Sequence, residues 1–254
     1  MITVNDILQF MEEIAPTHLK MAWDNVGLLC GRKDRQVTKI LVALDPFAHV
    51  CREAKELGAE LIVTHHPLIF NPLKAVTEDS ESGDCVLYLC ENGISAINAH
   101  TNLDVADGGV NDVLAKKLGL TEVCTLGDGL IRMGHVQEQG LASFLETVKT
   151  VLGCQGIRYA DGNKTVRKVA VGGGSCASEM NTAIAAGCDT FVTADVKYNH
   201  FRDAEFKGLN LIDAGHFCTE NPVMAVLAAK LRVAFPEIEV IESKSHKDCM
   251  NFFG

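Results

Sequence analysis

The sequence lacks the features that mark membrane, exported and nucleic-acid-binding proteins. No stretch approaches the roughly 18 consecutive apolar residues that a membrane-spanning helix needs. Asp6, Glu12 and Glu13 interrupt the N-terminal segment, so it has no apolar signal-peptide core. Lysine and arginine form no run, and the formal net charge of the 254 residues is −10. We therefore expect a cytoplasmic protein that binds neither membranes nor nucleic acid.

The ten cysteines also lack the spacing of the common cysteine motifs. No pair has the C-x-x-C spacing of a zinc knuckle or a thiol redox motif. We expect reduced, half-buried cysteines, with Cys218 of interest because it lies inside the motif HFCTE. What the chain has in quantity is apolar residues, 47% of the total, which are enough to fill the core of an α/β protein.

Helix and strand patterns alternate along the chain. Apolar residues at helical spacing predict a helix over 4–14, and the apolar run 39–45 predicts a buried strand. A helix over 48–57, a capping glycine at Gly58 and a second strand over 60–66 complete one βαβ unit.

The same order of elements returns later in the chain. Residues 168–195 align with 39–66 without a gap, and seven of the 28 positions are identical. A third strand pattern in 93–104 aligns with 208–220, and the connection 71–84 makes the first copy longer. We therefore predict two related three-layer α/β halves with mainly parallel strands.

The domain boundaries are predicted from these patterns. The first domain is expected over 1–125 and the second over 126–221, the second including a helix over 143–152. A helix over 222–235, with Pro222 at its first position, begins a segment 222–254 that is expected to pack back on the first domain.

Three motifs combine histidine with carboxylate at the predicted ends of strands. They are THHP (64–67), AHTNLD (99–104) and AGHFCTE (214–220). Ligands of open α/β sheets collect at the carboxyl ends of the strands, so we expect the three motifs to converge on one site in the cleft between the halves.

The residue types in these motifs are those of a metal site. His65 and His66 would point to opposite faces within a strand, but Pro67 turns the chain, so both rings can face one cavity. Two adjacent imidazoles would then suit two metals about 3.5–4 Å apart. Asp104 offers a carboxylate that can bridge two cations. The alternative for such a motif alone is a surface pair of histidines or a helix-capping loop.

The third motif adds His216 and Glu220, which complete a mixed nitrogen and oxygen ligand set. Imidazoles with carboxylates suit two divalent ions of Zn, Mn, Fe, Co or Ni rather than Ca.

Further candidates lie in the second half. TADVKYNH (193–200) occupies the place that THHP has in the first, so Asp195 and Lys197 could bind substrate and His200 could act as acid or base. An ordinary loop is the equal alternative. The glycine loop VGGGS (171–175) lacks the ending of a P-loop, and a tight turn is expected rather than an anion site. For Trp23 to Asn25 we expect a structural role.

The motifs THHPL, AHTNLD and GHFCTENP, together with WDNVGLL, resemble those of the GTP cyclohydrolase 1 type 2 homologues, a dinuclear-metal family also called domain of unknown function 34. The resemblance covers essentially the whole chain. It implies two α/β domains, a ring-shaped homohexamer and two metal ions held by His65, His66, Asp104, His216 and Glu220. His100 matches a family histidine beside the metals. The large middle domain of longer members is absent, since only 121–167 is available for it.

Two classes of function remain open at this point. One is a metal-dependent hydrolase acting on a nucleotide or another small phosphorylated compound, with His100 or His200 moving the proton. The other is a non-catalytic metal-binding, adaptor or metal-storage protein that forms a hexameric ring. Five protein ligands for two ions leave coordination positions open, which favours chemistry.

Overall fold

The computed structural model describes residues 1–253, which divide into two compact units. The first unit contains Met1–Asp107 and Met224–Lys247, and the second contains Gly108–Val223 and the residues from Asp248 onwards. The first boundary predicted from the sequence, at residue 125, lies later in the chain than Asp107, where the first segment of this unit ends. The compact unit ends earlier because the strand that begins at Thr121 pairs within the second unit. Within residues 1–253, no helix has both the length and the apolar character that a bilayer span requires.

The first unit is built on a five-stranded sheet. Its strands lie in the order β1 (Gly27–Cys30), β4 (Ser95–Asn98), β3 (Leu61–Thr64), β2 (Lys39–Ala43) and β11 (Glu239–Glu242). Strand β1 pairs antiparallel with β4, and the other pairs are parallel. All residues of β3 and β4 are buried, which explains why the sequence shows continuous apolar runs rather than an alternating pattern.

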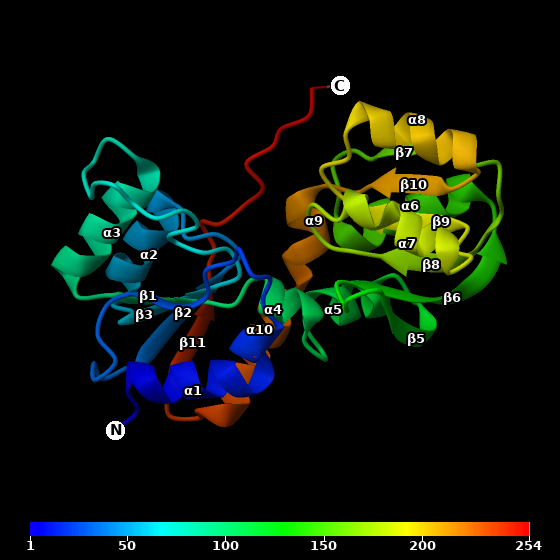
Figure 1. Ribbon diagram of the computed structural model, residues 1–254. Helices are drawn as coiled ribbons and strands as arrows, with labels where there is room; N and C mark the ends of the chain where they lie inside the picture. The colour runs from blue at the N-terminus through cyan, green and yellow to red at the C-terminus, as the bar shows by residue number, and fades with distance from the viewer. Residues whose placement is uncertain (254) are drawn as a thin grey trace. The chain divides into compact units, whose positions relative to one another are not determined.

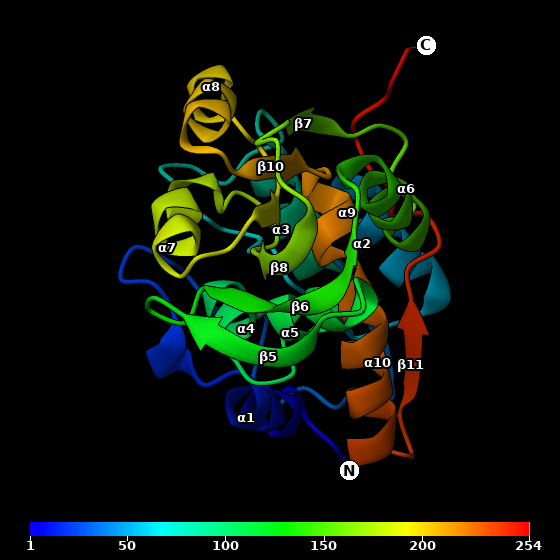
Figure 2. The same cartoon turned by 90° about the vertical axis from the view of Figure 1, so that its right-hand side faces the viewer.

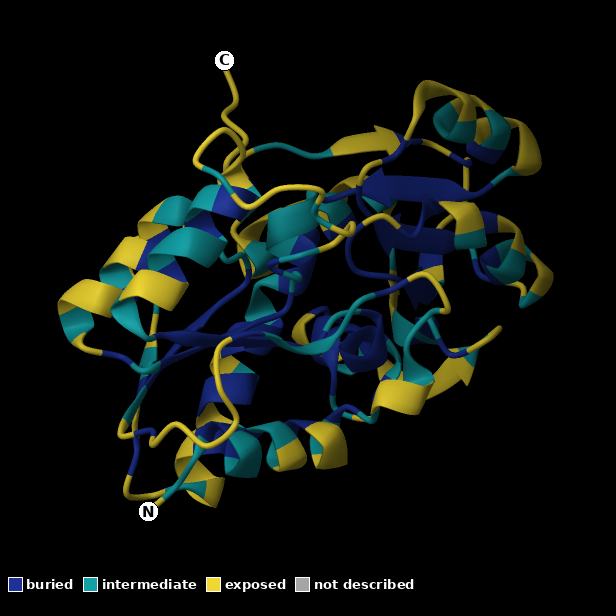
Figure 3. Ribbon diagram, turned by 60° about the vertical axis from the view of Figure 1, so that its left-hand side comes forward, coloured by how far each residue is buried: buried dark blue, intermediate teal, exposed yellow. Residues whose placement is uncertain are grey.

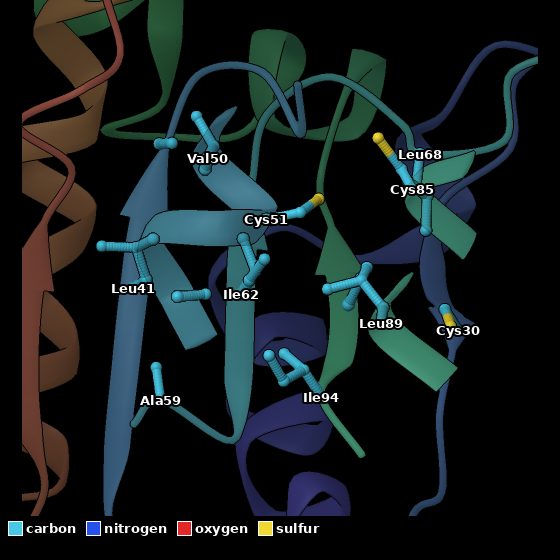
Figure 4. Packing of buried hydrophobic residues seen from close by; sticks show 13 residues of the cluster. Cys30, Leu41, Val50, Cys51, Ala59, Ile62, Leu68, Cys85, Leu89 and Ile94 are labelled. Carbon is cyan, nitrogen blue, oxygen red and sulfur yellow. The ribbon is translucent and has the colours of Figure 1, made fainter. Parts of the chain in front are cut away.

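Helices cover both faces of this sheet, so the unit has three layers (Figure 1). One face carries α2 (Ala48–Leu57) and α3 (Glu81–Asn92), and the other carries α1 (Val4–Ile14) and α10 (Pro222–Ala234). Figure 4 shows how Cys51 from α2 and Leu89 from α3 meet Ile62 of the sheet in one apolar cluster. Two short helices complete the unit, the 3-10 helix η1 (Thr17–Leu19) and α4 (Thr101–Val105).

The second unit has a six-stranded mixed sheet. Its strands lie in the order β5 (Thr121–Leu126), β6 (Ile131–Gln139), β8 (Val166–Val171), β9 (Thr190–Thr193), β10 (Asn210–Asp213) and β7 (Arg158–Ala160). Strands β8, β9 and β10 are parallel, and the outer strands add antiparallel pairs. The three parallel strands are those of the predicted second copy.

Two apolar clusters pack the helices of the second unit against opposite faces of its sheet. The 3-10 helix η2 (Ala177–Glu179), α7 (Met180–Ala185) and α8 (Tyr198–Lys207) lie on one face. Helices α5 (Val110–Lys117), α6 (Leu141–Leu152) and α9 (His216–Glu220) lie on the other. Figure 2 shows α7 and α8 on one side of the strands and α6 on the other, and Figure 3 shows buried inner strands beside exposed outer ones, in agreement with the burial of β9 and β10 and the exposure of β5.

The predicted α/β duplication is confirmed, down to single hydrogen bonds. The ammonium group of Lys39 donates to the carbonyl oxygen of Leu57 at 2.9 Å, and that of Lys168 donates to Ala186 at 2.6 Å. A glycine in the left-handed region follows each helix, with φ of 70° at Gly58 and 75° at Gly187. The two βαβ units therefore share their turns and side-chain anchors as well as their order of elements.

Most predicted elements lie close to their expected positions. The helix over 4–14 has the predicted bounds, and the helix at Pro222 begins where it was expected. The prediction was wrong for the connection 71–84, because α3 already begins at Glu81, where the Ser80 hydroxyl accepts a hydrogen bond from the Gly83 amide.

Candidate metal centre

The predicted ligands all follow the carboxyl ends of parallel strands. In the first unit, His65 and His66 come directly after β3, and Asp104 lies on α4, which follows β4. In the second unit, His216 and Glu220 lie on α9, which follows β10. Each unit therefore presents its own group of metal-binding residue types at the sheet edge where ligands of α/β folds collect.

In the first unit, three imidazoles converge. Ring nitrogens of His65, His66 and His100 all lie within 4.8 Å of one another, which is close enough to share a metal ion. His65 is fully buried, and its Nε2 lies 3.6 Å from Oδ1 of Asp104. The group thus offers nitrogen and oxygen donors together, the mixture that Zn, Mn, Fe, Co and Ni accept.

A hydrogen bond orients each of these three rings from behind. The Nδ1 atoms of His65, His66 and His100 lie 2.9 Å from the carbonyl oxygen of Ala99, 2.6 Å from Asp45 and 2.8 Å from Asp24, respectively. Carbonyl and carboxylate oxygens only accept, so each Nδ1 carries the proton. Each Nε2 is then the ring nitrogen that carries a lone pair, the atom through which a neutral imidazole binds a cation. This tethering is typical of metal-binding histidines, and the residues therefore fit a metal centre.

Asp24 is the buried anchor of His100. Its carboxylate also accepts hydrogen bonds from the Thr101 amide at 3.0 Å and from the Thr101 hydroxyl. Burial raises the pKa of Asp24, but the hydrogen bonds from His100 and Thr101 outweigh it and hold the pKa well below its usual range. Asp24 is therefore ionised at neutral pH and holds His100 by a charge-assisted hydrogen bond.

A structural role was expected for Trp23 to Asn25, but Asp24 and Trp23 also lie beside the candidate site. Asp24 contacts the candidate site directly, and the Trp23 ring, which is 62% exposed, has its centroid 6.2 Å from that of His100. Asn25 does have the expected structural role, because its side chain donates to the carbonyl oxygen of Ile69 at 2.6 Å.

In the second unit, His216 lies between two carboxylates. Its Nδ1 is 2.7 Å from Asp195 Oδ2, and its Nε2 is 2.9 Å from Glu220 Oε2. Burial lowers the pKa of His216, but the hydrogen bonds and charges of Asp195 and Glu220 raise it to about 11. Two carboxylates on one imidazole make a strong cation site, whether the cation is a proton or a metal ion.

The position of Asp195 gives it a role in addition to the predicted substrate binding. It lies behind His216 as Asp24 lies behind His100, so it orients a ring in the same way. The other two candidates from this segment lie on α8. Lys197 is its exposed N-cap residue, and His200 lies in its first turn with a buried Nδ1.

The glycine loop is explained by the close approach of α9. A Cβ atom at Gly174 would collide with the carboxylate of Glu220 and lie 3.1 Å from Nε2 of His216. Gly174 also has a φ of +60°, and its amide donates to the Thr219 hydroxyl at 3.0 Å. The glycines make room for ligand residues, so the expected tight turn serves the candidate site.

Besides the role of Asp24, the sequence did not indicate Asp45, which accepts the hydrogen bond from His66. Its only signal is that it lies two residues after the end of the apolar strand 39–43, at the same sheet edge as the histidines.

Comparisons with known proteins find relatives along nearly the whole chain. Residues 2–249 match the family Duf34/NIF3 (NGG1p interacting factor 3). The GTP cyclohydrolase 1 type 2 homolog of Clostridium perfringens is 38% identical, covering 98% of this chain and 99% of that protein. GTP cyclohydrolase 1 type 2 of Helicobacter pylori strain J99 is 31% identical, covering 96% of this chain and 97% of that protein.

Solved structures share the fold over nearly the whole chain. A Bacillus cereus protein related to NIF3 superposes with a TM-score of 0.93 at 26% identity, covering 100% of this chain and 99% of that one. Reduced HcgD from Methanocaldococcus jannaschii gives a TM-score of 0.84 at 29% identity, covering 96% of this chain and 98% of that one.

Proposed function

The chain belongs to the Duf34/NIF3 family, and from that premise we propose that it is a metal-dependent hydrolase with two divalent ions per chain. The observation that carries the proposal is the tethering of the histidines. His65, His66 and His100 each donate from Nδ1 to an oxygen, which directs Nε2 toward a cation.

Five side chains would hold the two ions. The first unit supplies His65, His66 and Asp104, and the second supplies His216 and Glu220. When bound, the ions would act as Lewis acids toward a phosphoryl or carbonyl oxygen and make a water molecule more acidic. The identity of the ions is left among Zn, Mn, Fe, Co and Ni, because imidazole and carboxylate serve all of them.

The chain's own residues would position the substrate and move the proton. His100, held by ionised Asp24, is placed to accept or donate a proton, and His200 is the second candidate for that role. Exposed Lys197 would neutralise a phosphate group, while Asp195 would orient His216 and contact the substrate at its free edge.

For the substrate we propose a nucleotide or another small phosphorylated compound, as the names of the Helicobacter pylori and Clostridium perfringens relatives suggest. We further propose that the chain acts in the cytoplasm as a homohexamer, in line with the family resemblance of its motifs.

Metal content tests the proposal. Elemental analysis of the wild-type protein should give about two ions per chain. The double substitution His65→Ala/Asp104→Ala should lose most of this metal, whereas His18→Ala, which removes an exposed histidine elsewhere in the first unit, should lose none. Circular dichroism would establish that each variant is folded.

Either result directs the next step. Wild-type protein that carries two ions would be tested against nucleotides and phosphate esters, and absence of hydrolysis across that set would favour the non-catalytic metal-binding or storage function. Wild-type protein that takes up no metal after careful reloading would contradict both functions.

A further inference from the structure

The segment that follows β11 lies against the strand ends of the first unit. The Ser243 amide donates to the carbonyl oxygen of Val42 at 2.8 Å, so this segment continues alongside β2. The His246 amide then donates to the hydroxyl of Ser243 at 3.1 Å, which turns the chain back toward the sheet edge. His246 is thereby directed to the end of β2, where Asp45 lies.

One carboxylate ties this segment to α2. Glu53 accepts hydrogen bonds from the Lys244 amide at 2.9 Å and from the Ser245 hydroxyl at 2.6 Å, and also from the hydroxyl of Ser243. These bonds fix three consecutive residues before His246. The position of His246 is therefore set by the hydrogen bonds that hold the preceding residues to Glu53, in addition to the contacts of the His246 ring itself.

The His246 ring is buried between an aromatic ring and a carboxylate. Its side chain is 3% exposed and stacks on Phe47, with ring centroids 5.9 Å apart and planes 18° from parallel. Its Nε2 lies 2.9 Å from Oδ2 of Asp45. The Asp45 amide nitrogen also lies 3.2 Å from this Nε2. Because a carboxylate only accepts, the shorter contact to Oδ2 requires that Nε2 carries the proton and donates it.

Asp45 is shared between two histidines. Its Oδ2 accepts from His246, while its Oδ1 lies 2.6 Å from Nδ1 of His66. A carboxylate with a single partner can rotate about its last side-chain bond, whereas a carboxylate with a partner on each oxygen is held in one plane. The plane of Asp45 in turn sets the direction of the His66 ring.

We propose that His246 is a positioning residue of the metal centre, which acts through Asp45 to fix the orientation of the ligand His66. This inference rests on the proposed function, since it takes His66 as a metal ligand. It adds that the end of the chain, 180 residues away from His66, is part of what makes the first unit's ligand group ready for a cation. Outer hydrogen-bond partners of this kind contribute 10–100-fold to metal affinity.

Two substitutions separate the hydrogen bond from the packing. His246→Phe keeps a flat ring for the stack on Phe47 but removes the donor to Asp45. His246→Gln keeps an N–H donor at a similar distance from the backbone but removes the ring. The matched control is His49→Ala, because the His49 ring lies in the same group, 6.4 Å from that of His246, yet is exposed.

The experiment is a titration of the metal-free, full-length protein with Co²⁺, followed by calorimetry and by visible ligand-field absorption. We expect His246→Phe to bind the ion of the first unit's group about tenfold more weakly, with a changed absorption spectrum. His246→Gln should retain most of the affinity, and His49→Ala should match the wild type. Thermal unfolding would show that His246→Phe is folded.

A double-mutant cycle with Asp45→Ala tests the route of the effect. If His246 acts through Asp45, then His246→Phe should cost nothing further in the Asp45→Ala background. Unchanged affinity and spectrum in His246→Phe, or an equal loss with and without Asp45, would overturn the inference while leaving the proposed function intact. Failure of the wild type to bind Co²⁺ would overturn both.

Discussion

Glu60 and Asp189 occupy the same place in the two halves of the repeat and bind the same groups. Glu60 lies 3.0 Å from each of the Thr38 and Lys39 amides, and Asp189 lies 3.1 Å from the Arg167 amide and 2.7 Å from the Lys168 amide. In each unit the carboxylate thus accepts from two amides near the start of an inner strand of the sheet.

We predict that Glu60→Gln lowers the free energy of unfolding of the first unit by about 1–2 kcal/mol at pH 7. A hydrogen bond to a charged group contributes roughly 1.5–3 kcal/mol, and partial exposure of Glu60 reduces this. Both amides donate to the same oxygen, Oε2, so glutamine can keep these two contacts, but it loses the charge and the second acceptor oxygen, which faces the Thr38 hydroxyl. The control is Glu56→Gln, an exposed residue on α2.

The effect should depend on pH with a definite sign. Burial raises the pKa of Glu60, but hydrogen bonds from Thr38 and Lys39 outweigh it and hold the pKa below 4.5. A carboxylate with a depressed pKa stabilises the folded state above its unfolded pKa, and this stabilisation is lost as the pH falls through the folded value. The difference between wild type and Glu60→Gln should therefore be complete at pH 7 and shrink below pH 4.5.

Urea unfolding from pH 7 downward measures this difference, and hydrogen exchange locates it at the amides of Thr38 and Lys39. Because the two units can unfold separately, the exchange data show which unit is affected. Equal unfolding midpoints at pH 7, or a difference that does not change as the pH falls, would refute the reasoning.

Three further predictions concern the candidate site. Asp24→Asn should weaken Co²⁺ binding roughly 10–100-fold, measured by calorimetry, because an amide holds His100 less firmly than a carboxylate does; unchanged affinity would count against His100. Gly174→Ala should displace Glu220 and reduce the bound metal in elemental analysis, with Gly140→Ala, which meets no atom within 4 Å, as the control. Paramagnetic Co²⁺ should quench the emission of Trp23, the single tryptophan, because its ring lies 6.2 Å from that of His100; an emission that ignores Co²⁺ would contradict a metal beside His100.

The repeat and the strand ends could be predicted because they are local in sequence. Apolar runs of strand length, a glycine after each helix and the shared spacing between Lys39 and Gly58 all lie within one short window. The dependence on short stretches of sequence also explains why the start of α3 was predicted wrongly. Its capping residues Ser80 and Gly93 were present as signals, but Gly83 and the polar residues around it read as a connection.

The groups that orient the ligands could not be predicted in the same way. Asp45 and His246 are separated by 201 positions, and nothing in either neighbourhood indicates the other. Asp24 lies 76 positions from His100, and its role depends on the path of the loop that carries Trp23. Sequence patterns show which residues follow a strand, but the contacts between loops depend on how the whole unit packs.

The repeat has one consequence for the history of the chain. Position 66 in the first half corresponds to position 195 in the second. His66 is a histidine whose ring is held by Asp45, whereas Asp195 is an aspartate that holds the ring of His216. Equivalent positions therefore carry opposite members of a histidine–aspartate pair. The halves have kept interchangeable scaffolds, with the same lysine anchors and left-handed glycines, while their ends have become specialised. If the second half were a copy of the first, position 195 would be a histidine, and His216 would lose the carboxylate that accepts the hydrogen bond from its Nδ1. The two copies thus share the residues that hold their helices and turns, and differ in the residues at the ends of their strands, where each now needs what the other lacks.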